Sequence, residues 1–208
     1  MNKRALLLIV FMLAGIPPVL AMSNEDDPRI LISYMDKALT PELDILRVTA
    51  QALPDSLVFQ IKTRGERTGG ESGDYLLLHI THGKSYTLLV PVNKAEQDKI
   101  LMYEGAAIQS AHNTSSEPIK LSRKLDPQTG FSAQRIHHGV EFSVPLDWID
   151  FGNDFGYDAY TAQVEIQDHA IQINELYDQA GKGRKEKKQY SAITLINKLC
   201  ATRRMTTN

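Results

Sequence analysis

Residues 41–63, PELDILRVTAQALPDSLVFQIKT, predict two β-strands folded back on each other. The first strand is mostly apolar, and in the second Leu57, Phe59 and Ile61 occupy alternate positions and therefore share one face. Between them, residues 53–56 (LPDS) supply turn chemistry, because proline presets φ and the aspartate and serine side chains bond nearby backbone. A hairpin with one apolar face must be covered by a second sheet, so this stretch predicts a β-sandwich.

The chain beyond this hairpin supplies further strands. Residues 75–81 and 85–92 predict a second hairpin around a tight turn, and residues 139–145 and 160–167 alternate apolar with polar side chains. Weaker strands are predicted at 30–32, 99–103, 106–110, 119–121, 169–176 and 191–196, a helical turn at 146–149, and loops at 64–74, 126–130, 151–157 and 181–188.

The fold class follows from the spacing of these strands. About eight short strands, separated by glycine-rich or polar turns, are typical of an antiparallel β-sandwich of the immunoglobulin or jelly-roll kind. No long segment between the strands has a 3.6-residue period, which argues against an α/β fold. We therefore expect one all-β domain over residues 30–200, with a loose acidic lead-in at 22–29 and a flexible tail at 201–208.

The N-terminus has the features of a secretory signal peptide over residues 1–21. Lys3 and Arg4 precede an apolar run at residues 5–13 that is too short to span a bilayer, and Ala21 offers a cleavage point. The alternative, a retained membrane anchor, is disfavoured by the prolines that follow the apolar run. The prediction is a periplasmic or secreted protein with no transmembrane span after cleavage.

Charge and cysteine content restrict the class of protein further. The chain has 23 Lys and Arg against 25 Asp and Glu, and loss of the two basic residues of the signal peptide would change its net charge from −2 to −4. A nucleic-acid-binding domain is usually strongly basic, so we expect no nucleic-acid partner. The single cysteine, Cys200, excludes an internal disulfide and is expected to be a small buried hydrophobe, so stability must come from the core.

Three short segments carry a family resemblance. TPELDI at 40–45, LVFQIKT at 57–63 and VEFSVPLDWI at 140–149 resemble segments of DOMON-like domains and family-nine carbohydrate-binding modules. The resemblance covers roughly residues 26–167 and implies an exported β-sandwich that binds a sugar or a haem group. This chain departs from both patterns: its single tryptophan cannot form a two-tryptophan clamp, and its methionines show no recognisable spacing to a histidine.

An aromatic and acidic run over residues 147–160 is the predicted ligand site. Aromatic faces can stack on a sugar ring, and nearby carboxylates can accept hydrogen bonds from its hydroxyl groups. The alternative is that the aromatic residues close the end of the sandwich while the aspartates form turns. The predicted ligand-binding residues are Trp148, Asp150, Asp154, Phe155 and Tyr157, in a run that also contains Phe151.

Acidic and histidine residues offer weaker candidates for metal binding. Asp27, Asp36 and Asp44 are carboxylates that could hold a calcium ion, although the alternative is a solvated edge. His79 and His82 should point to opposite sides of a strand. The adjacent histidines at 137 and 138 are expected to be poorly placed for a shared ion.

No catalytic motif is present in the sequence, so the protein is expected not to be an enzyme. The leading hypothesis is a carbohydrate-binding module. One alternative is a haem-binding electron-transfer domain in which Met35 or Met102 acts with a histidine. Another is an envelope structural or assembly protein that uses its sheet edges. The basic loop at 181–188 is expected to be a solvated hairpin tip.

Overall fold

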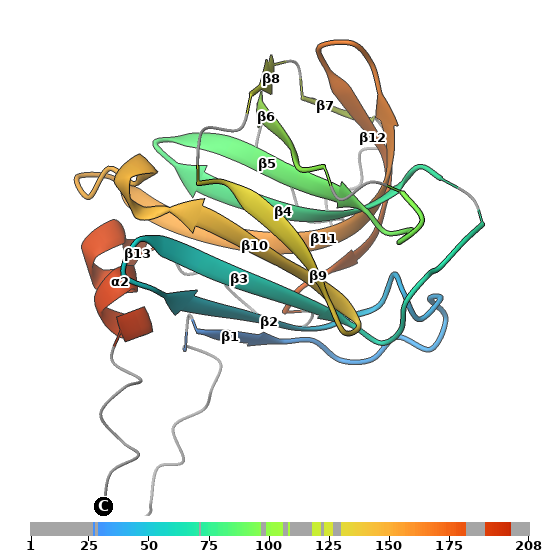
Figure 1. Cartoon of the computed structure of the whole chain (residues 1–208), viewed down its shortest axis with the longest axis horizontal. Helices are drawn as coiled ribbons and strands as arrows, with labels where there is room; N and C mark the ends of the chain where they lie inside the picture. The colour runs from blue at the N-terminus through green and yellow to red at the C-terminus, as the bar shows by residue number, and fades with distance from the viewer. Residues whose placement is uncertain are drawn as a thin grey trace, which may run out of the picture.

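The hairpin predicted at residues 41–63 lies at the centre of the smaller of two sheets (Figure 1) in the computed structural model. The described residues are 27, 29–70, 72–96, 99–105, 108, 118–121, 123–126, 130–181 and 190–200. The predicted signal peptide, the tail, and most of the predicted segments 22–29, 106–110 and 181–188 lie outside these residues, as does the side chain of Cys200.

The smaller sheet contains five antiparallel strands in the order β1-β2-β3-β10-β9. Phe59 in β3 lies directly opposite Phe142 in β10, and both side chains are fully buried. Because alternate residues of these strands face the same way, their apolar side chains form one wall of the core. The strands are β1 (Ile30–Ile32), β2 (Ile45–Ala52), β3 (Ser56–Thr63), β9 (Ser132–Ile136) and β10 (Gly139–Pro145).

The larger sheet is also antiparallel, with the order β7-β12-β11-β4-β5-β6-β8, and β13 pairs separately with β11. Its strands β4 and β5 form the second predicted hairpin, joined at Gly83, whose φ of +63° suits a tight turn. The strands are β4 (Asp74–His82), β5 (Lys84–Pro91), β6 (Leu101–Gly105), β7 (Ile119–Leu121), β8 (Arg123–Leu125), β11 (Asp154–Ile166), β12 (Ile171–Gln179) and β13 (Tyr190–Ser191). The prediction of an all-β antiparallel sandwich is confirmed.

The main core lies between the two sheets. Leu76, Leu78 and Ile80 of β4 face the apolar wall of the smaller sheet, and all three are buried. Removing this much apolar surface from water is the dominant stabilising term, worth roughly 1.5–3 kcal/mol for each fully buried large aliphatic side chain. The predicted inward face of the second hairpin is therefore confirmed.

The larger sheet also buries its other face. Leu77, Leu89 and Tyr160 on that face are 0 % exposed, and they form a second core with residues of β7 and β12. Figure 1 shows β12 curving toward β7, near β6. The approach is close, because a Cβ added to Gly105 in β6 would lie 2.7 Å from Leu121 of β7. The sheet thus curls on itself and encloses its own core.

Tyrosines in and near this second core make the protein sensitive to alkaline pH. Burial raises the pKa of Tyr103, and burial together with the adjacent Asp158 carboxylate raises the pKa of Tyr160. A tyrosine in the unfolded chain ionises near pH 10, so the unfolded state loses these protons first. The stabilisation is therefore complete below about pH 10 and declines as the pH rises from there through the folded-state pKa.

We expect the urea midpoint to fall as the pH rises above about 10, and the fall to be shallower in Tyr160→Phe. Tyr34→Phe is the matched control, because the Tyr34 side chain is 79 % exposed, and it should follow the wild-type curve. Identical pH dependence of the wild type and Tyr160→Phe would contradict the assignment.

The elements predicted at 151–157 and 191–196 differ from the structure. The predicted loop at 151–157 ends early, because β11 begins at Asp154. The predicted strand at 191–196 is wrong, since helix α2 (Ala192–Cys200) occupies this segment. Ala192, Leu195 and Leu199 are buried at helical spacing, and the backbone N–H of Thr194 donates to Ser191 Oγ at 3.3 Å as in an N-terminal cap.

The predictions for the shorter elements agree more closely with the structure. The helical turn expected at 146–149 is the 3-10 helix η2 (Leu146–Trp148), and β7 is an edge strand as expected. The strand predicted at 99–103 lies two residues later, as β6. Within the described residues, no helix combines the length and apolar character needed to cross a membrane.

Candidate functional site

Trp148 is the last residue of η2, the turn that follows β10 at one end of the sandwich. Its indole is half-buried among three rings, at centroid distances of 4.9 Å from Tyr86, 5.3 Å from Phe131 and 5.4 Å from His82. All three contacts are tilted or edge-on, with interplanar angles of 75°, 77° and 59°. These contacts hold the indole in place. Among the described residues, no ring stacks parallel to the indole and covers its flat face.

The loop after η2 is ordered by its own hydrogen bonds. The Asp150 carboxylate accepts from the Gly152 backbone N–H at 2.8 Å and from Asn153 Nδ2 at 2.6 Å. The Asp150 backbone N–H donates to His82 Nε2 at 2.6 Å, which connects the loop to β4. This local network displays Phe151, which is 45 % exposed, close in sequence to Trp148. Asp154 is also exposed, at the start of β11.

His82 contributes a buried donor to this end of the molecule. A backbone N–H can only donate, so His82 Nε2 must accept and the ring proton of the neutral imidazole lies on Nδ1. The His82 residue is 7 % exposed, and Nδ1 has no hydrogen-bond partner in the described part of the chain. Buried polar groups are usually hydrogen-bonded to protein or to ordered water, so this enclosed donor beside Trp148 is a position where a water molecule would complete the hydrogen bonding.

The five predicted ligand-binding residues lie in different environments in the structure. Trp148, Asp150 and Asp154 lie at the same end of the sandwich, in η2, the loop after it and the start of β11. Phe155 is 0 % exposed and stacks on Phe59 at 6.5 Å, so it belongs to the core and has no exposed face for a ligand. Tyr157 is half-buried, and its ring is 4.9 Å from the ring of Phe59. The aromatic residues that do surround Trp148 come partly from the second hairpin.

A row of polar side chains crosses the inner face of the curled sheet. His79 lies opposite both Asp158 and Thr87 on its two neighbouring strands, and Thr87 lies opposite Tyr103. All four are buried, and His79 Nδ1 is 3.1 Å from Thr87 Oγ1. His79 therefore faces away from His82, which confirms that these two histidines point to opposite sides of β4.

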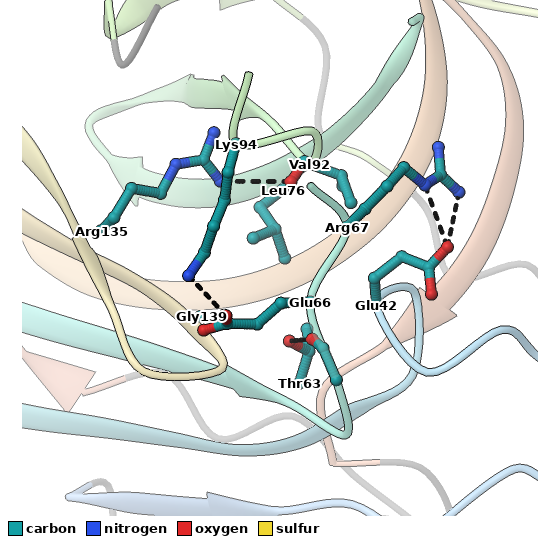
Figure 2. A pocket seen from close by; sticks show the side chains of 10 residues that line it. Glu42, Thr63, Glu66, Arg67, Leu76, Val92, Lys94, Arg135 and Gly139 are labelled. Atoms are coloured by element: carbon teal, nitrogen blue, oxygen red, sulfur yellow. Dashed lines mark hydrogen bonds and ion pairs between the residues drawn. The ribbon is translucent and has the colours of Figure 1, made fainter. Parts of the chain in front are cut away.

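A charged depression lies at the other end of the sandwich (Figure 2). Arg67 pairs with Glu42 at 2.8 Å and Lys94 pairs with Glu66 at 2.5 Å. Arg67 also pairs with Asp74 at 2.5 Å. Lys94, followed by the His138 backbone N–H, holds the pKa of Glu66 below its ordinary value. The depression is lined by Glu42, Thr63, Gly65, Glu66, Arg67, Leu76, Val92, Lys94, Arg135 and Gly139.

The three aspartates predicted to hold calcium do not converge. Asp27 pairs with Arg29 at 2.5 Å. Asp44 is 0 % exposed and accepts from Arg64 Nε at 2.9 Å and from the Asp36 backbone N–H at 3.1 Å. The Asp36 carboxylate accepts from the Ala38 backbone N–H at 2.9 Å. Each carboxylate therefore has its own partners within the protein.

The methionines considered for haem differ in their surroundings. Met102 is 3 % exposed and lies in the core between the sheets, whereas Met35 is 54 % exposed in the segment after β1. His82, on the same face of the larger sheet as Met102, lies opposite Lys84, while Met102 lies opposite Leu88. Four residues of an extended strand, roughly 13 Å, therefore separate them along the strand direction, and two inter-strand spacings of about 4.8 Å add to this.

The sequence could not have predicted which residues surround Trp148, because His82 and Tyr86 lie more than sixty positions earlier in the chain. Comparison of the chain with protein-family models, with curated proteins and with solved structures finds no match.

Proposed function

We propose that this protein is an exported, non-catalytic ligand-binding module, and that the end of the sandwich around Trp148 binds carbohydrate. The observation that carries the proposal is the half-buried indole, which is fixed by three tilted ring contacts and is not covered by a parallel ring from the described residues. A pre-organised aromatic surface binds a ligand without a large loss of side-chain freedom.

The groups around the indole fit the chemistry of a sugar. The C–H groups of a pyranose ring pack on an aromatic face, and Trp148 with the exposed Phe151 supplies such surface. Hydroxyl groups need both donors and acceptors, and here the exposed Asp154 carboxylate can accept while the exposed Asn153 side-chain amide can donate and accept. A single tryptophan favours binding to one face of a chain or a terminal sugar over a two-sided clamp.

The non-catalytic part of the proposal rests on the carboxylates at this end. Both oxygens of Asp150 already accept hydrogen bonds from the loop, so its carboxylate has a structural role there. An acid and base pair would need two carboxyl groups facing each other across a cleft.

The export part of the proposal rests on the signal-peptide features of residues 1–21.

Retention on insoluble polysaccharides tests the proposal. A panel of cellulose, chitin, xylan and peptidoglycan should include at least one that retains the wild type, and Phe151→Ala should weaken that retention about tenfold, the equivalent of ~1.4 kcal/mol. Trp148→Phe, which keeps an aromatic ring in the cluster, should weaken it further. Asp168→Ala is the matched control, because Asp168 is an exposed aspartate in the turn between β11 and β12.

Retention that is unchanged in both aromatic variants would place binding elsewhere on the surface. Retention of the wild type by no member of the panel would count against carbohydrate as the ligand. Thermal melts of each variant separate a loss of binding from a loss of folding.

A second candidate function is assembly with another envelope component through a sheet edge. β1 is an edge strand of the smaller sheet, and Ile30, Ile32 and the following Tyr34 are 38 %, 61 % and 79 % exposed. Exposed apolar residues along a free strand edge favour pairing with another chain. The two candidates differ in the residues they need, since assembly through β1 does not involve Phe151.

A further inference from the structure

The turn between β9 and β10 brings two histidines against a glutamate. His137 and His138 form this turn, with their imidazole rings stacked at a centroid distance of 3.9 Å and an interplanar angle of 27°. His137 Nδ1 lies 3.9 Å from Glu66 Oε1, which comes from the loop after β3. One ligand atom from each of the three residues lies within 4.8 Å of the other two.

The backbone conformation explains why adjacent histidines lie on one side. Neighbouring residues in a strand point to opposite faces, which is why the sequence argued against a shared ion. His138, however, has a φ of +51° in the left-handed region, and the rings of the turn stack. The expectation that these two histidines are poorly placed for one ion therefore does not hold.

The turn is anchored on the rest of the sheet. The His138 backbone N–H donates to Glu66, and the His138 carbonyl accepts from the Thr63 backbone N–H at 2.9 Å. Lys62 Nζ donates to the His137 carbonyl. These bonds fix the backbone while the His137 side chain remains 82 % exposed and able to rotate. An uncommon φ in a residue held by its surroundings is a reason to look for function.

We propose that Glu66, His137 and His138 bind a divalent transition-metal ion of the zinc and copper type. Imidazole nitrogen and carboxylate oxygen are ligands that these ions accept, with zinc bonds of about 2.0–2.2 Å. In a tetrahedral site such bonds place ligand atoms about 3.4 Å apart, so the three groups must draw closer, and rotation of His137 out of the ring stack supplies the movement. Three protein ligands leave a position for water or another ligand.

Lys94 opposes the ion and should lower its affinity for the site. Its ammonium pairs with Glu66 Oε2 at 2.5 Å, so an incoming cation meets a positive charge on the far side of the same carboxylate. Removing this ammonium should tighten binding, whereas removing a ligand should weaken it. His137→Asn and His138→Asn remove a ligand without removing an acidic charge, so weakening in these two variants distinguishes the site from general attraction of cations to an acidic protein.

Isothermal titration of untagged protein with zinc chloride, repeated with copper chloride, tests the proposal. We expect saturable binding of one ion per chain, weakened at least about tenfold by His137→Asn, His138→Asn or Glu66→Gln. Asparagine suits position 138 because it tolerates the left-handed region. Lys94→Met should tighten binding, roughly fivefold. His169→Asn, at an exposed histidine in the turn before β12, is the control and should not change the affinity.

Three results would overturn the site: no saturable binding by the wild type, affinity unchanged in His138→Asn, or equal weakening in His169→Asn. Full retention of affinity in Glu66→Gln would reject the three-ligand site in favour of the histidines alone. Circular dichroism of each variant shows that the fold is retained, so a loss of binding reports the loss of a ligand. The site is independent of Trp148, because β10 runs from this turn to the opposite end of the sandwich.

Discussion

Replacing Gly139 with alanine is expected to lower the free energy of unfolding by at least about 3 kcal/mol. A Cβ at this position would lie 1.9 Å from the carbonyl oxygen of Ile61, which belongs to the backbone of β3 and cannot rotate away. The φ of +153° also lies in a region that residues with side chains rarely adopt. Gly139 pairs with Lys62 on one side and Ile136 on the other. The backbone shift needed to relieve the contact would therefore disturb the pairing of β10 with both β3 and β9.

Urea unfolding followed by circular dichroism measures this effect, and Gly69→Ala is its matched control. A Cβ at Gly69 meets nothing within 4 Å, and its φ is not in the left-handed region. The control should therefore change stability by no more than about 0.5 kcal/mol. A loss below 1 kcal/mol in Gly139→Ala would show that β10 does not pair with β3 in this register.

Asp44→Ala is expected to have the second-largest effect, a loss of about 3 kcal/mol. The carboxylate is 0 % exposed, and it accepts from Arg64 Nε at 2.9 Å and from the Asp36 backbone N–H at 3.1 Å. Truncation leaves both donors without this partner in a largely dry environment, which costs more than the interaction itself. We place the loss at the lower end of the usual range because the Arg64 side chain is 26 % exposed.

Thermal and urea unfolding of Asp44→Ala should be compared with Asp27→Ala. Asp27 also pairs with an arginine, but the side chains of Arg29 and Asp27 are 34 % and 22 % exposed, and surface ion pairs contribute about 0–1 kcal/mol. The two substitutions remove the same group from different depths. Equal losses in the two variants would mean that burial of the Asp44 ion pair does not decide its contribution.

Period-two patterning was sufficient to predict both hairpins and the main core. Leu57, Phe59 and Ile61 face the core as expected, because a strand with one apolar face has only one way to bury it. The second core was missed for a related reason. In the run YLLLHIT, Tyr75 and Leu77 alternate with the residues that face the smaller sheet, and only a curled sheet gives both faces cover.

The helix at the C-terminal end could have been predicted. Ser191 precedes apolar residues at 192, 195, 196 and 199, which is the spacing of one helical face, but the β-prone residues of the segment outweighed it. The pairing of β11 with β13 and β4 extends β11 back to Asp154, and long-range pairing of this kind leaves no local signal.

The candidate sites show more clearly what could not be predicted from the sequence. Trp148 was predicted as a site residue without its neighbours His82 and Tyr86, which the β4–β5 hairpin brings from a distant segment. It assigned Phe155 to the site, and alternation along β11 turns that ring into the core instead. The convergence of His137, His138 and Glu66 depends on one unusual φ and on contact between separate loops, neither of which a spacing rule can give.

Fluorescence of Trp148 during titration with soluble oligosaccharides tests the central claim most directly, because it is the only tryptophan in the chain. The proposed site predicts a saturable change in the intensity or wavelength of its emission with the oligosaccharide of the retained polysaccharide, and a weaker response in Phe151→Ala. Emission that stays constant at saturating sugar, while calorimetry shows the sugar bound, would place the ligand away from Trp148 and contradict the account.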